Sequence, residues 1–207
     1  HVAAGMASAV WPDVPANENP IGYVTNGVDV DTFLGASWVA QFDMYLGRGW
    51  RAKLTDRQFL KTFIAGIPNH VYRSVRQVHT DAMFAELRQR LVVQLQRSGC
   101  VDSVVRDVTG QLTQDSRDVL VIGFARRFAT YKRAGLILSD IDRLLALLNR
   151  PNMPVQLIFA GKAHQKDEPG KHFIQQIANL RHGPRFAGRF VYIEDYDINV
   201  CRHMIQG

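Results

Sequence analysis

The sequence VLVIGFARRFATYKR, residues 119–133, determines how the second half of the chain folds. Residues 119–124 form a continuous apolar run, which predicts a β-strand buried on both faces. Apolar residues at helical spacing over residues 136–148 then predict an α-helix. Between the two lie four cations: Arg126, Arg127, Lys132 and Arg133. The stretch therefore predicts a strand, a basic crossover and a helix.

The same order of strand and helix recurs twice more along the chain. We predict strands at residues 155–160 and 189–193, and helices at residues 171–180 and 198–205. Three such units predict an α/β fold with a parallel sheet and right-handed crossovers. Since parallel sheets bind ligands at the carboxyl ends of their strands, functional residues are expected just after each strand.

Helices are predicted to precede this sheet. Residues 1–35 contain three prolines, which predict loops and short strands. Apolar spacing predicts a helix at residues 36–46, a second helix with a capping box that starts at Thr55, and a long third helix at residues 69–97. Residues 100–117 are polar and are expected to connect these helices to the sheet.

The composition sets the broad class of the chain. With 207 residues, 46% hydrophobic and 21% charged, it is neither collagen-like, disordered nor a disulfide scaffold. No apolar run approaches the roughly 20 residues of a membrane span, so no membrane partner is expected. No leader peptide follows His1, and the pattern is unfinished at Gly207, so we expect a fragment of a longer protein. Cys100 and Cys201 are isolated, which favours two small buried side chains and a cytoplasmic location.

The charge of the chain is unevenly distributed. The net charge is +6, but residues 1–47 hold five acidic residues and no lysine or arginine, so residues 48–207 carry +11. Such a basic body indicates an anionic partner: nucleic acid, a phosphate ester or inorganic phosphate. Nineteen of the 25 cations are arginine, whose planar guanidinium suits two-point contacts with oxyanions. The cations are not interleaved with aromatic side chains, so nucleic acid is not the expected partner.

The basic crossover at residues 125–133 is the strongest candidate site. If its cations lie at the start of a helix, they face the positive end of the helix dipole, which costs about 0.3–1 kcal/mol each. A bound anion would remove that conflict, so we expect a phosphate site here. The alternative is a set of solvated cations that project from a loop. No glycine loop of the GxxxxGK[ST] type is present.

The other two strand ends offer weaker candidates. Gly161 and Lys162 follow the second strand, where a glycine permits a ligand to approach the backbone closely. A metal site is set aside, and no metal is expected, because its ligands would be irregularly spaced: His164, Asp167, Glu168 and His172.

Acidic residues follow the third strand. Glu194 and Asp195 could form a glycosidase pair. However, neighbours in a strand point to opposite faces, which favours a structural role. Asp197 suits the start of the next helix.

Four ordered segments resemble the α-glucan phosphorylases, the family of glycogen, starch and maltodextrin phosphorylases, with the best match in the short bacterial subgroup. They are VTNGVDVDTF, GFARRFATYKR, FAGKAH and EDYD, which begin at Val24, Gly123, Phe159 and Glu194. The resemblance covers residues 20–207 and implies a two-lobed GT-B glycosyltransferase with a Rossmann-like sheet in each lobe. It implies that residues 1–25 are the tail of the N-terminal lobe, 26–118 a helical lead-in, and 119–207 the first three strand–helix units of an incomplete Rossmann-like sheet.

The resemblance also implies the reaction. In this family a glucosyl unit passes from an α-1,4-glucan or maltodextrin to inorganic phosphate with retention of configuration, and glucose 1-phosphate is released. The cofactor is pyridoxal 5'-phosphate, whose phosphate group takes part in proton transfer. The family's Schiff-base lysine belongs to a segment that follows this stretch, so the chain alone is expected to bind phosphate weakly and to be inactive. The full enzyme could form a homo-oligomer.

The matching motifs imply roles for five residues. Arg127 and Lys132 match the residues that hold the substrate phosphate and are the expected catalytic groups. Arg126 matches a residue near the cofactor phosphate, and Tyr131 one beside the glucosyl and phosphate groups. Asn26 matches an asparagine that hydrogen-bonds the glucosyl unit. A further candidate on the cofactor side is Lys162.

Asp29 departs from the short subgroup, which usually has histidine at this position, and Asp31 replaces a common proline. Two alternatives to a phosphorylase stay open. A nucleotide-sugar GT-B glycosyltransferase, similar to glycogen synthase, would use the same cations to hold a diphosphate. A non-catalytic glucan-binding relative would account for the change at Asp29.

Overall fold

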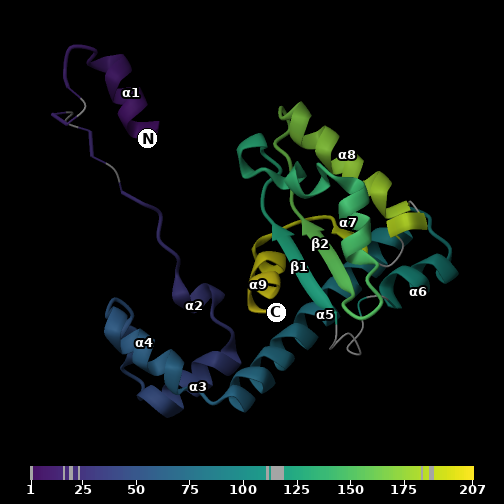
Figure 1. Ribbon diagram of the computed structural model, residues 1–207, viewed down its shortest axis with the longest axis horizontal. Helices are drawn as coiled ribbons and strands as arrows, with labels where there is room; N and C mark the ends of the chain where they lie inside the picture. Colours follow the sequence, from purple (N-terminus) through teal and green to yellow (C-terminus); the bar gives the residue numbers. More distant parts are fainter. Residues whose placement is uncertain are drawn as a thin grey trace. The chain divides into compact units, whose positions relative to one another are not determined.

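The structure is a computed structural model that describes the chain except for residues 1, 16, 19–20, 23, 111, 113–118, 183 and 187–188. The chain divides into two compact units, His1–Thr32 and Phe33–Gly207 (Figure 1). Helix α1 (Val2–Val10) belongs to the first unit, and α2 (Val30–Phe33) begins there. The prediction of loops and strands is therefore wrong for residues 2–10, which are rich in alanine and lack proline.

A parallel three-stranded sheet lies at the centre of the second unit. Its strands β1 (Leu120–Ala125), β2 (Val155–Ala160) and β3 (Phe190–Ile193) lie in the order β1-β2-β3. Gly123 pairs with Ile158, and Ile158 with Val191, in register across the sheet. The predicted α/β class and the three predicted strands are confirmed within about one residue at each end.

Two helical layers cover the sheet. Because strand side chains alternate between faces, Leu157 and Phe159 pack against α7 (Ile141–Leu148) and α8 (Glu168–His182). Ile158 and Ala160 face the opposite side. There they pack against α5 (Asn69–Arg97), α6 (Asp102–Gly110) and α9 (Ile198–Gln206) (Figure 1). The predicted helices over residues 69–97, 171–180 and 198–205 are confirmed.

Strand β1 is less buried than its apolar sequence predicts. Leu120 is 61% exposed and Ile122 43% exposed, whereas β2 and β3 are buried from Gln156 and Phe190 onwards. Strands β1 and β3 are the two edges of the described sheet, and β3 is nevertheless buried, so position at an edge does not by itself explain the exposure of β1. Ile122 shares an open apolar cavity with Leu136 and Ile137.

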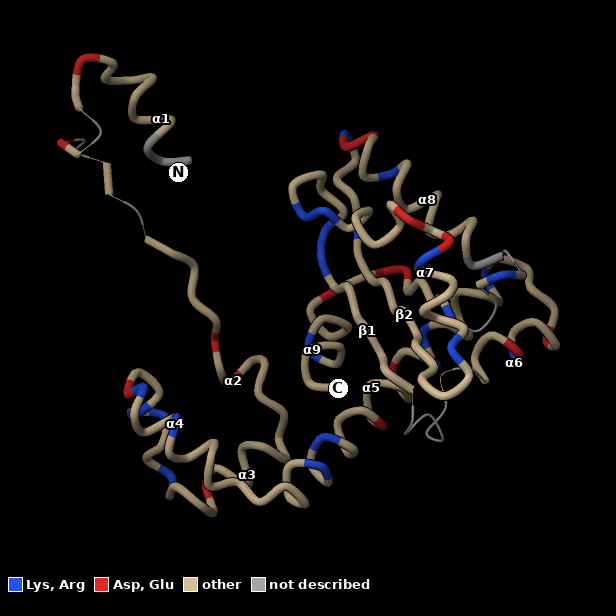
Figure 2. Tube along the Cα trace, viewed as in Figure 1, with Lys and Arg blue, Asp and Glu red and all other residues tan. Residues whose placement is uncertain are grey.

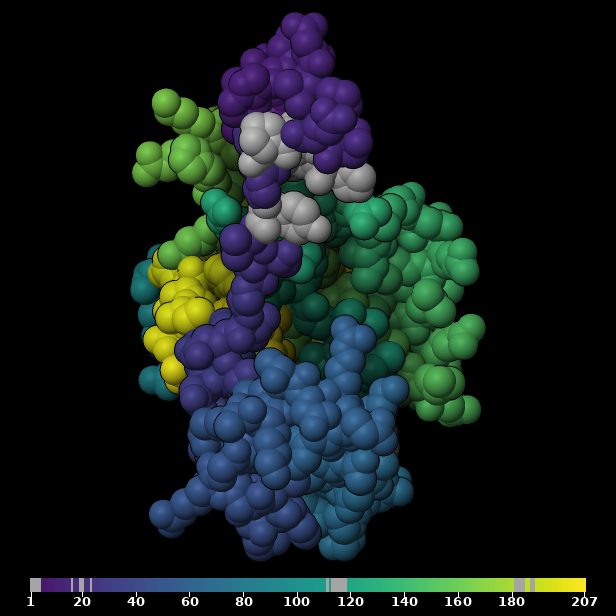
Figure 3. Space-filling view, turned by 90° about the vertical axis from the view of Figure 1, so that its left-hand side faces the viewer, coloured from purple at the N-terminus to yellow at the C-terminus, as the bar shows by residue number. Residues whose placement is uncertain are grey.

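Aromatic contacts connect the helices that precede α5, apart from the core around the sheet. Helix α3 (Ala36–Leu46) is confirmed as predicted, and its Phe42 ring meets Phe63 of α4 (Arg57–Gly66) edge-on at 4.8 Å. The Phe42 ring also contacts Trp50 at 5.0 Å. These helices form the blue surface at one end of the second unit in Figure 3.

Two local predictions about the helices are wrong. Asp56, not Thr55, caps α4, because its carboxylate accepts hydrogen bonds from the N–H groups of Gln58 and Phe59 at 2.9 and 3.0 Å. The expected connection at residues 100–117 contains α6, whose Val105 packs on the α5 core. No described helix is both long enough and apolar enough to cross a membrane.

Candidate functional site

The carboxyl ends of β1 and β2 bring two predicted site segments together. The N–H of Arg126 donates to the Ala160 carbonyl at 3.1 Å, and the N–H of Phe128 donates to the Lys162 carbonyl at 3.0 Å. The loop that follows β1 therefore runs beside the residues that follow β2. This arrangement confirms that Arg126 and Lys162 lie at one edge of the sheet.

Gly161 allows this close approach. A Cβ atom at Gly161 would lie 2.1 Å from the Arg126 carbonyl oxygen and 2.7 Å from the Phe128 ring, so no larger residue fits without a shift of the loop. Phe128 is buried and packs between Phe124 and Phe173, at 5.6 Å from each ring. The loop is thus anchored by an aromatic side chain, while the adjacent Arg126 and Arg127 remain exposed.

The cations of this loop have no acidic partners. Arg126 and Arg127 are exposed and Lys132 is half-buried. The basic residues that follow β1 colour the trace blue beyond the end of that strand in Figure 2. In the described part of the chain, neither they nor Lys162 form an ion pair, although other arginines do. The Lys132 ammonium lies 4.6 Å from the centroid of the Tyr131 ring, a cation–π contact that aligns two predicted site residues. Positive charge without a counter-charge favours binding of an anion at this edge.

The expected helix does not begin among these cations. Instead, Lys132 lies in a short 3₁₀ turn at Thr130–Lys132, a second such turn follows at Ala134–Leu138, and α7 starts only at Ile141. Asp140 caps α7 by accepting a hydrogen bond from Arg143 N–H at 2.9 Å, so its carboxylate satisfies the helix N-terminus. The helix-dipole argument for an anion is therefore wrong, and the cations project from a loop, as in the alternative.

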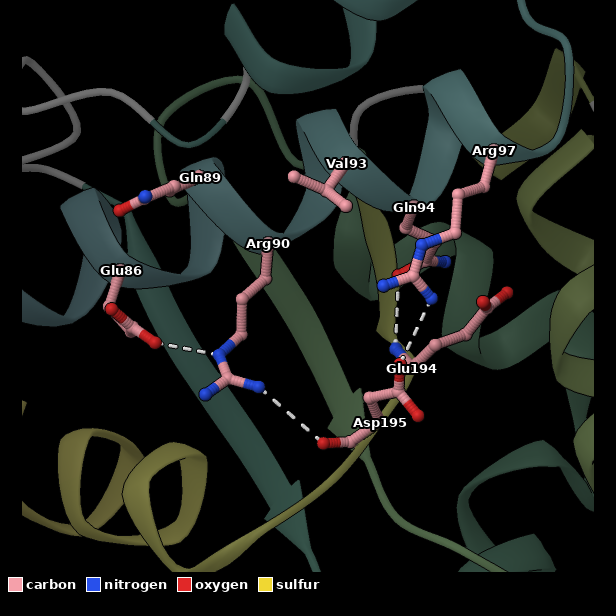
Figure 4. Close-up of a pocket in the computed structure, with 8 residues that line it drawn as sticks. All are labelled: Glu86, Gln89, Arg90, Val93, Gln94, Arg97, Glu194 and Asp195. Atoms are coloured by element: carbon pink, nitrogen blue, oxygen red, sulfur yellow. Dashed lines mark hydrogen bonds and ion pairs between the residues drawn. The ribbon is translucent and has the colours of Figure 1, made fainter.

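The acidic turn after β3 has the predicted structural role. Two ion pairs connect helix α5 to this turn: Arg97 pairs with Asp195 at 3.2 Å, and Arg90 pairs with Asp197 at 3.1 Å. Asp197 also caps α9 through the N–H of Val200, a hydrogen bond that lowers the pKa of this carboxyl. A groove of about 280 Å³ separates α5 from the turn (Figure 4).

Two tyrosines hydrogen-bond the chain where β1 and β2 end, one at Gly161 and one at the start of the basic loop (residues 125–133), and sequence reasoning missed both. The hydroxyl of Tyr192, the third residue of β3, donates to the Gly161 carbonyl at 3.3 Å. The hydroxyl of Tyr196 donates to the Ala125 carbonyl at 3.1 Å. Burial raises the pKa of Tyr192 to about 12, and nearby Glu194 and Asp195 add to this shift. For Tyr192 the sequence contained an indication of this role, since a tyrosine inside a buried strand needs a hydrogen-bond partner for its hydroxyl.

The other residues considered as site residues either belong to the first unit or contact neighbours in their own segment. Asn26 is exposed in the first unit, and its contact with a glucosyl unit stays a prediction. The residues weighed as metal ligands have neighbours in their own segment. Asp167 accepts a hydrogen bond from Gly170 N–H at 2.9 Å, and Glu168 pairs with Lys171 at 2.6 Å.

Several known proteins similar to this chain are phosphorylases. Maltodextrin phosphorylase of Thermococcus litoralis is 34% identical over 208 residues, which cover 100% of this chain and 24% of that protein. Glycogen phosphorylase of Aquifex aeolicus is 36% identical over 98% of this chain and 29% of its own length. Glycogen phosphorylase of Mycobacterium tuberculosis is 32% identical over 100% of this chain and 23% of its own length.

The chain is a homologue of one segment of the glycogen and maltodextrin phosphorylases. The resemblance to α-glucan phosphorylases is thereby confirmed, while the assignment to a short bacterial subgroup stays a prediction. The chain spans about a quarter of the length of these relatives. No family model matches it.

The tight contact at Gly161 can be tested by Gly161→Ala. The added methyl group must displace the Arg126–Phe128 loop, so the free energy of unfolding should fall by about 1–3 kcal/mol in urea denaturation. Gly49→Ala is the matched control, because a Cβ at Gly49 meets nothing within 4 Å and its φ of −84° suits alanine. Equal stability of the two variants would contradict the close approach.

The buried Tyr192 hydroxyl predicts a loss of stability at alkaline pH. The folded-state pKa of about 12 exceeds the ordinary value of 10.0, so the protonated phenol stabilises the fold fully below pH 10. This stabilisation should be lost as the pH rises from 10 towards 12, by at most about 1.4 kcal/mol per pH unit. Urea unfolding across this range should show a shallower slope for Tyr192→Phe than for the wild type. Parallel curves would show that Tyr192 does not titrate as described.

Proposed function

We propose that this chain supplies the phosphate-binding part of an α-glucan phosphorylase. The complete enzyme would transfer a glucosyl unit from glycogen or maltodextrin to inorganic phosphate and release glucose 1-phosphate with retained configuration. The observation that carries this proposal is the group of cations at the carboxyl edge of the sheet that have no acidic partner among the described residues. The names of the relatives, which are glycogen and maltodextrin phosphorylases, support the same reaction.

Each site residue then has a proposed role. Arg127 would hold the substrate phosphate through two parallel hydrogen bonds, and Lys132 would add a point charge on the same phosphate. The ring of Tyr131, which lies under the Lys132 ammonium, would border the glucosyl group. Asn26 would hydrogen-bond the sugar, and Lys162 would face the cofactor side.

The cations of the basic loop suit a reaction between two phosphate groups. Two phosphate dianions repel each other strongly at contact distance, so several fixed cations are needed to bring them together. Arg126, Arg127 and Lys132 follow one strand, and Lys162 follows the next, so one edge supplies charge for both phosphates. No carboxylic acid is needed as proton donor in this scheme. This agrees with the pairing of Asp195 with Arg97.

The residues present also fit a phosphate-bearing cofactor. More positive charge lies at this edge than a single phosphate requires, because the edge holds Arg126, Arg127, Lys132 and Lys162. Of these, Arg126 would hold the phosphate of pyridoxal 5'-phosphate. When this cofactor is bound, its phosphate group would supply the proton exchange with the substrate phosphate. We assign none of the lysines of this chain to its aldehyde.

The wider organisation follows from the same proposal. The chain would belong to a two-lobed GT-B enzyme, with residues 1–25 in the N-terminal lobe, residues 26–118 as the lead-in and residues 119–207 in the C-terminal lobe. The α/β architecture of the three-stranded parallel sheet supports the assignment of residues 119–207 to a Rossmann-like lobe. A cytoplasmic location and self-association of the complete enzyme are further parts of the proposal.

Neither alternative function gains support from the structure. No observation favours a nucleotide-sugar donor over two monophosphates. Asp29, the feature in favour of a non-catalytic relative, accepts a hydrogen bond from the N–H of Thr32 at 2.9 Å at the start of α2. This local hydrogen bond accounts for an aspartate at position 29 without any role in glucan binding.

The proposed phosphate contact predicts the effect of Arg127→Ala. The wild-type chain, titrated with inorganic phosphate and followed by amide chemical shifts, should bind phosphate weakly. The affinity of Arg127→Ala for phosphate should be at least about tenfold lower, since a hydrogen bond to a charged group contributes about 1.5–3 kcal/mol. In a complete phosphorylase that carries this segment, the same change should slow phosphorolysis by about 10²–10³-fold. Arg150→Ala, at an exposed turn before β2, should bind phosphate like the wild type. Unchanged binding by Arg127→Ala would refute the site.

A further inference from the structure

The turn after β3 reaches across the edge of the sheet to the basic loop. Tyr196 lies in this turn, and its hydroxyl donates to the carbonyl of Ala125, the last residue of β1. We propose that Tyr196 is a positioning residue that fixes the direction in which Arg126 and Arg127 leave the sheet. This inference rests on the proposed function, because it concerns how the phosphate-binding side chains are held.

The peptide unit between Ala125 and Arg126 is held from two sides. Its carbonyl accepts the Tyr196 hydrogen bond at 3.1 Å, and its N–H donates to the Ala160 carbonyl at 3.1 Å. Because a peptide unit is planar, fixing both polar groups fixes its rotation about the chain direction. The Cα of Arg126 belongs to the same plane, so the start of the basic loop has a defined orientation.

Helix α5 in turn holds Tyr196 in place. Arg90, Gln94 and Arg97 lie on one face of α5, at spacings of four and three residues (Figure 4). Arg90 pairs with Asp197, the residue after Tyr196, and Arg97 pairs with Asp195, the residue before it. Both neighbours of the tyrosine are therefore tied to the same helix.

Gln94 fixes the entrance to the turn. This side chain is only 4% exposed, its amide NH₂ donates to the Tyr192 carbonyl at 3.0 Å, and its oxygen accepts from Glu194 N–H at 3.0 Å. Asp195 then adopts φ +52°, a left-handed conformation that is uncommon for a residue other than glycine. The turn keeps this conformation because α5 holds the residues on either side of it.

The surroundings of the Tyr196 hydroxyl keep it protonated as a donor. Burial raises its pKa, and contact with the Cys201 thiol of α9 raises it further, while the Arg126 guanidinium opposes these effects. The hydroxyl therefore remains a hydrogen-bond donor at neutral and mildly alkaline pH. The phosphate-binding loop thus depends on a residue that makes no predicted contact with phosphate.

The test is phosphate titration of the full 207-residue chain carrying Tyr196→Phe, which removes one hydroxyl. We expect the dissociation constant for inorganic phosphate to rise about three- to tenfold, in line with the loss of one hydrogen bond. Tyr45→Phe is the matched control, because Tyr45 is half-exposed on α3 and should bind phosphate like the wild type. Wild-type binding by Tyr196→Phe would overturn the inference.

A double-mutant cycle with Arg127→Ala separates positioning from a general loss of structure. If Tyr196 acts through Arg127, its substitution should have little effect once Arg127 is absent. An equal effect in both backgrounds would overturn the inference. If Arg127→Ala itself leaves phosphate binding unchanged, the proposed function fails first; if only Tyr196→Phe is silent, the proposed function stands and the positioning role fails.

A second variant keeps the inference testable if Tyr196→Phe does not fold. Arg90→Lys retains the charge but cannot contact Glu86 and Asp197 together with the fork geometry of a guanidinium. It should loosen the turn and raise the phosphate dissociation constant about two- to fivefold, a fraction of a hydrogen bond. If folded Arg90→Lys binds phosphate with wild-type affinity, the claim that α5 positions the turn around Tyr196 is contradicted.

Discussion

The close approach of Gly161 to the loop after β1 is the constraint on which the site depends. Without a side chain at Gly161, the Arg126 carbonyl and the Phe128 ring can rest on the end of β2. Phe128 is then buried among aromatic rings, and the cations around it are turned towards solvent. The same contact aligns two strand ends, so charges from separate crossovers gather at one edge of the sheet.

Charge distribution explains why this edge would attract an anion. Elsewhere in the described structure, Arg90, Arg97 and Arg185 are each paired with an acidic side chain. Arg126, Arg127 and Lys132 are not, so their mutual repulsion is relieved only by solvent or by a bound anion. Acidic residues are present nearby in the turn after β3, but α5 holds Asp195 and Asp197 and thereby keeps them occupied. Helix α5 therefore pairs two of the acidic side chains near this edge, so these two do not serve as counter-charges for the basic loop.

Much of the fold follows from periodicity in the sequence. The continuous apolar runs predicted β2 and β3, and helical spacing predicted α3, α5, α8 and α9, because in each case burial of an apolar face decides the structure. The pattern misled for β1, since apolarity does not show whether a neighbour covers the strand. It also failed between residues 126 and 140, where local 3₁₀ turns and the capping by Asp140 delay the helix.

The supporting tyrosines could not be predicted in the same way. Tyr192 and Tyr196 meet carbonyls that are 31 and 71 residues away in the sequence, and only the sheet order brings them together. The cations themselves were identified from the sequence, yet their helix-dipole rationale was wrong. What remained valid was their position after a strand, which the topology of a parallel sheet determines.

A crystal structure of the chain with tungstate, a tetrahedral oxyanion with strong anomalous scattering, tests the central claim most directly. The account predicts an anomalous peak within hydrogen-bond distance of the Arg127 guanidinium and the Lys132 ammonium. Tungstate bound instead at other arginines, such as Arg73 and Arg76 of α5, with none at Arg127, would contradict it.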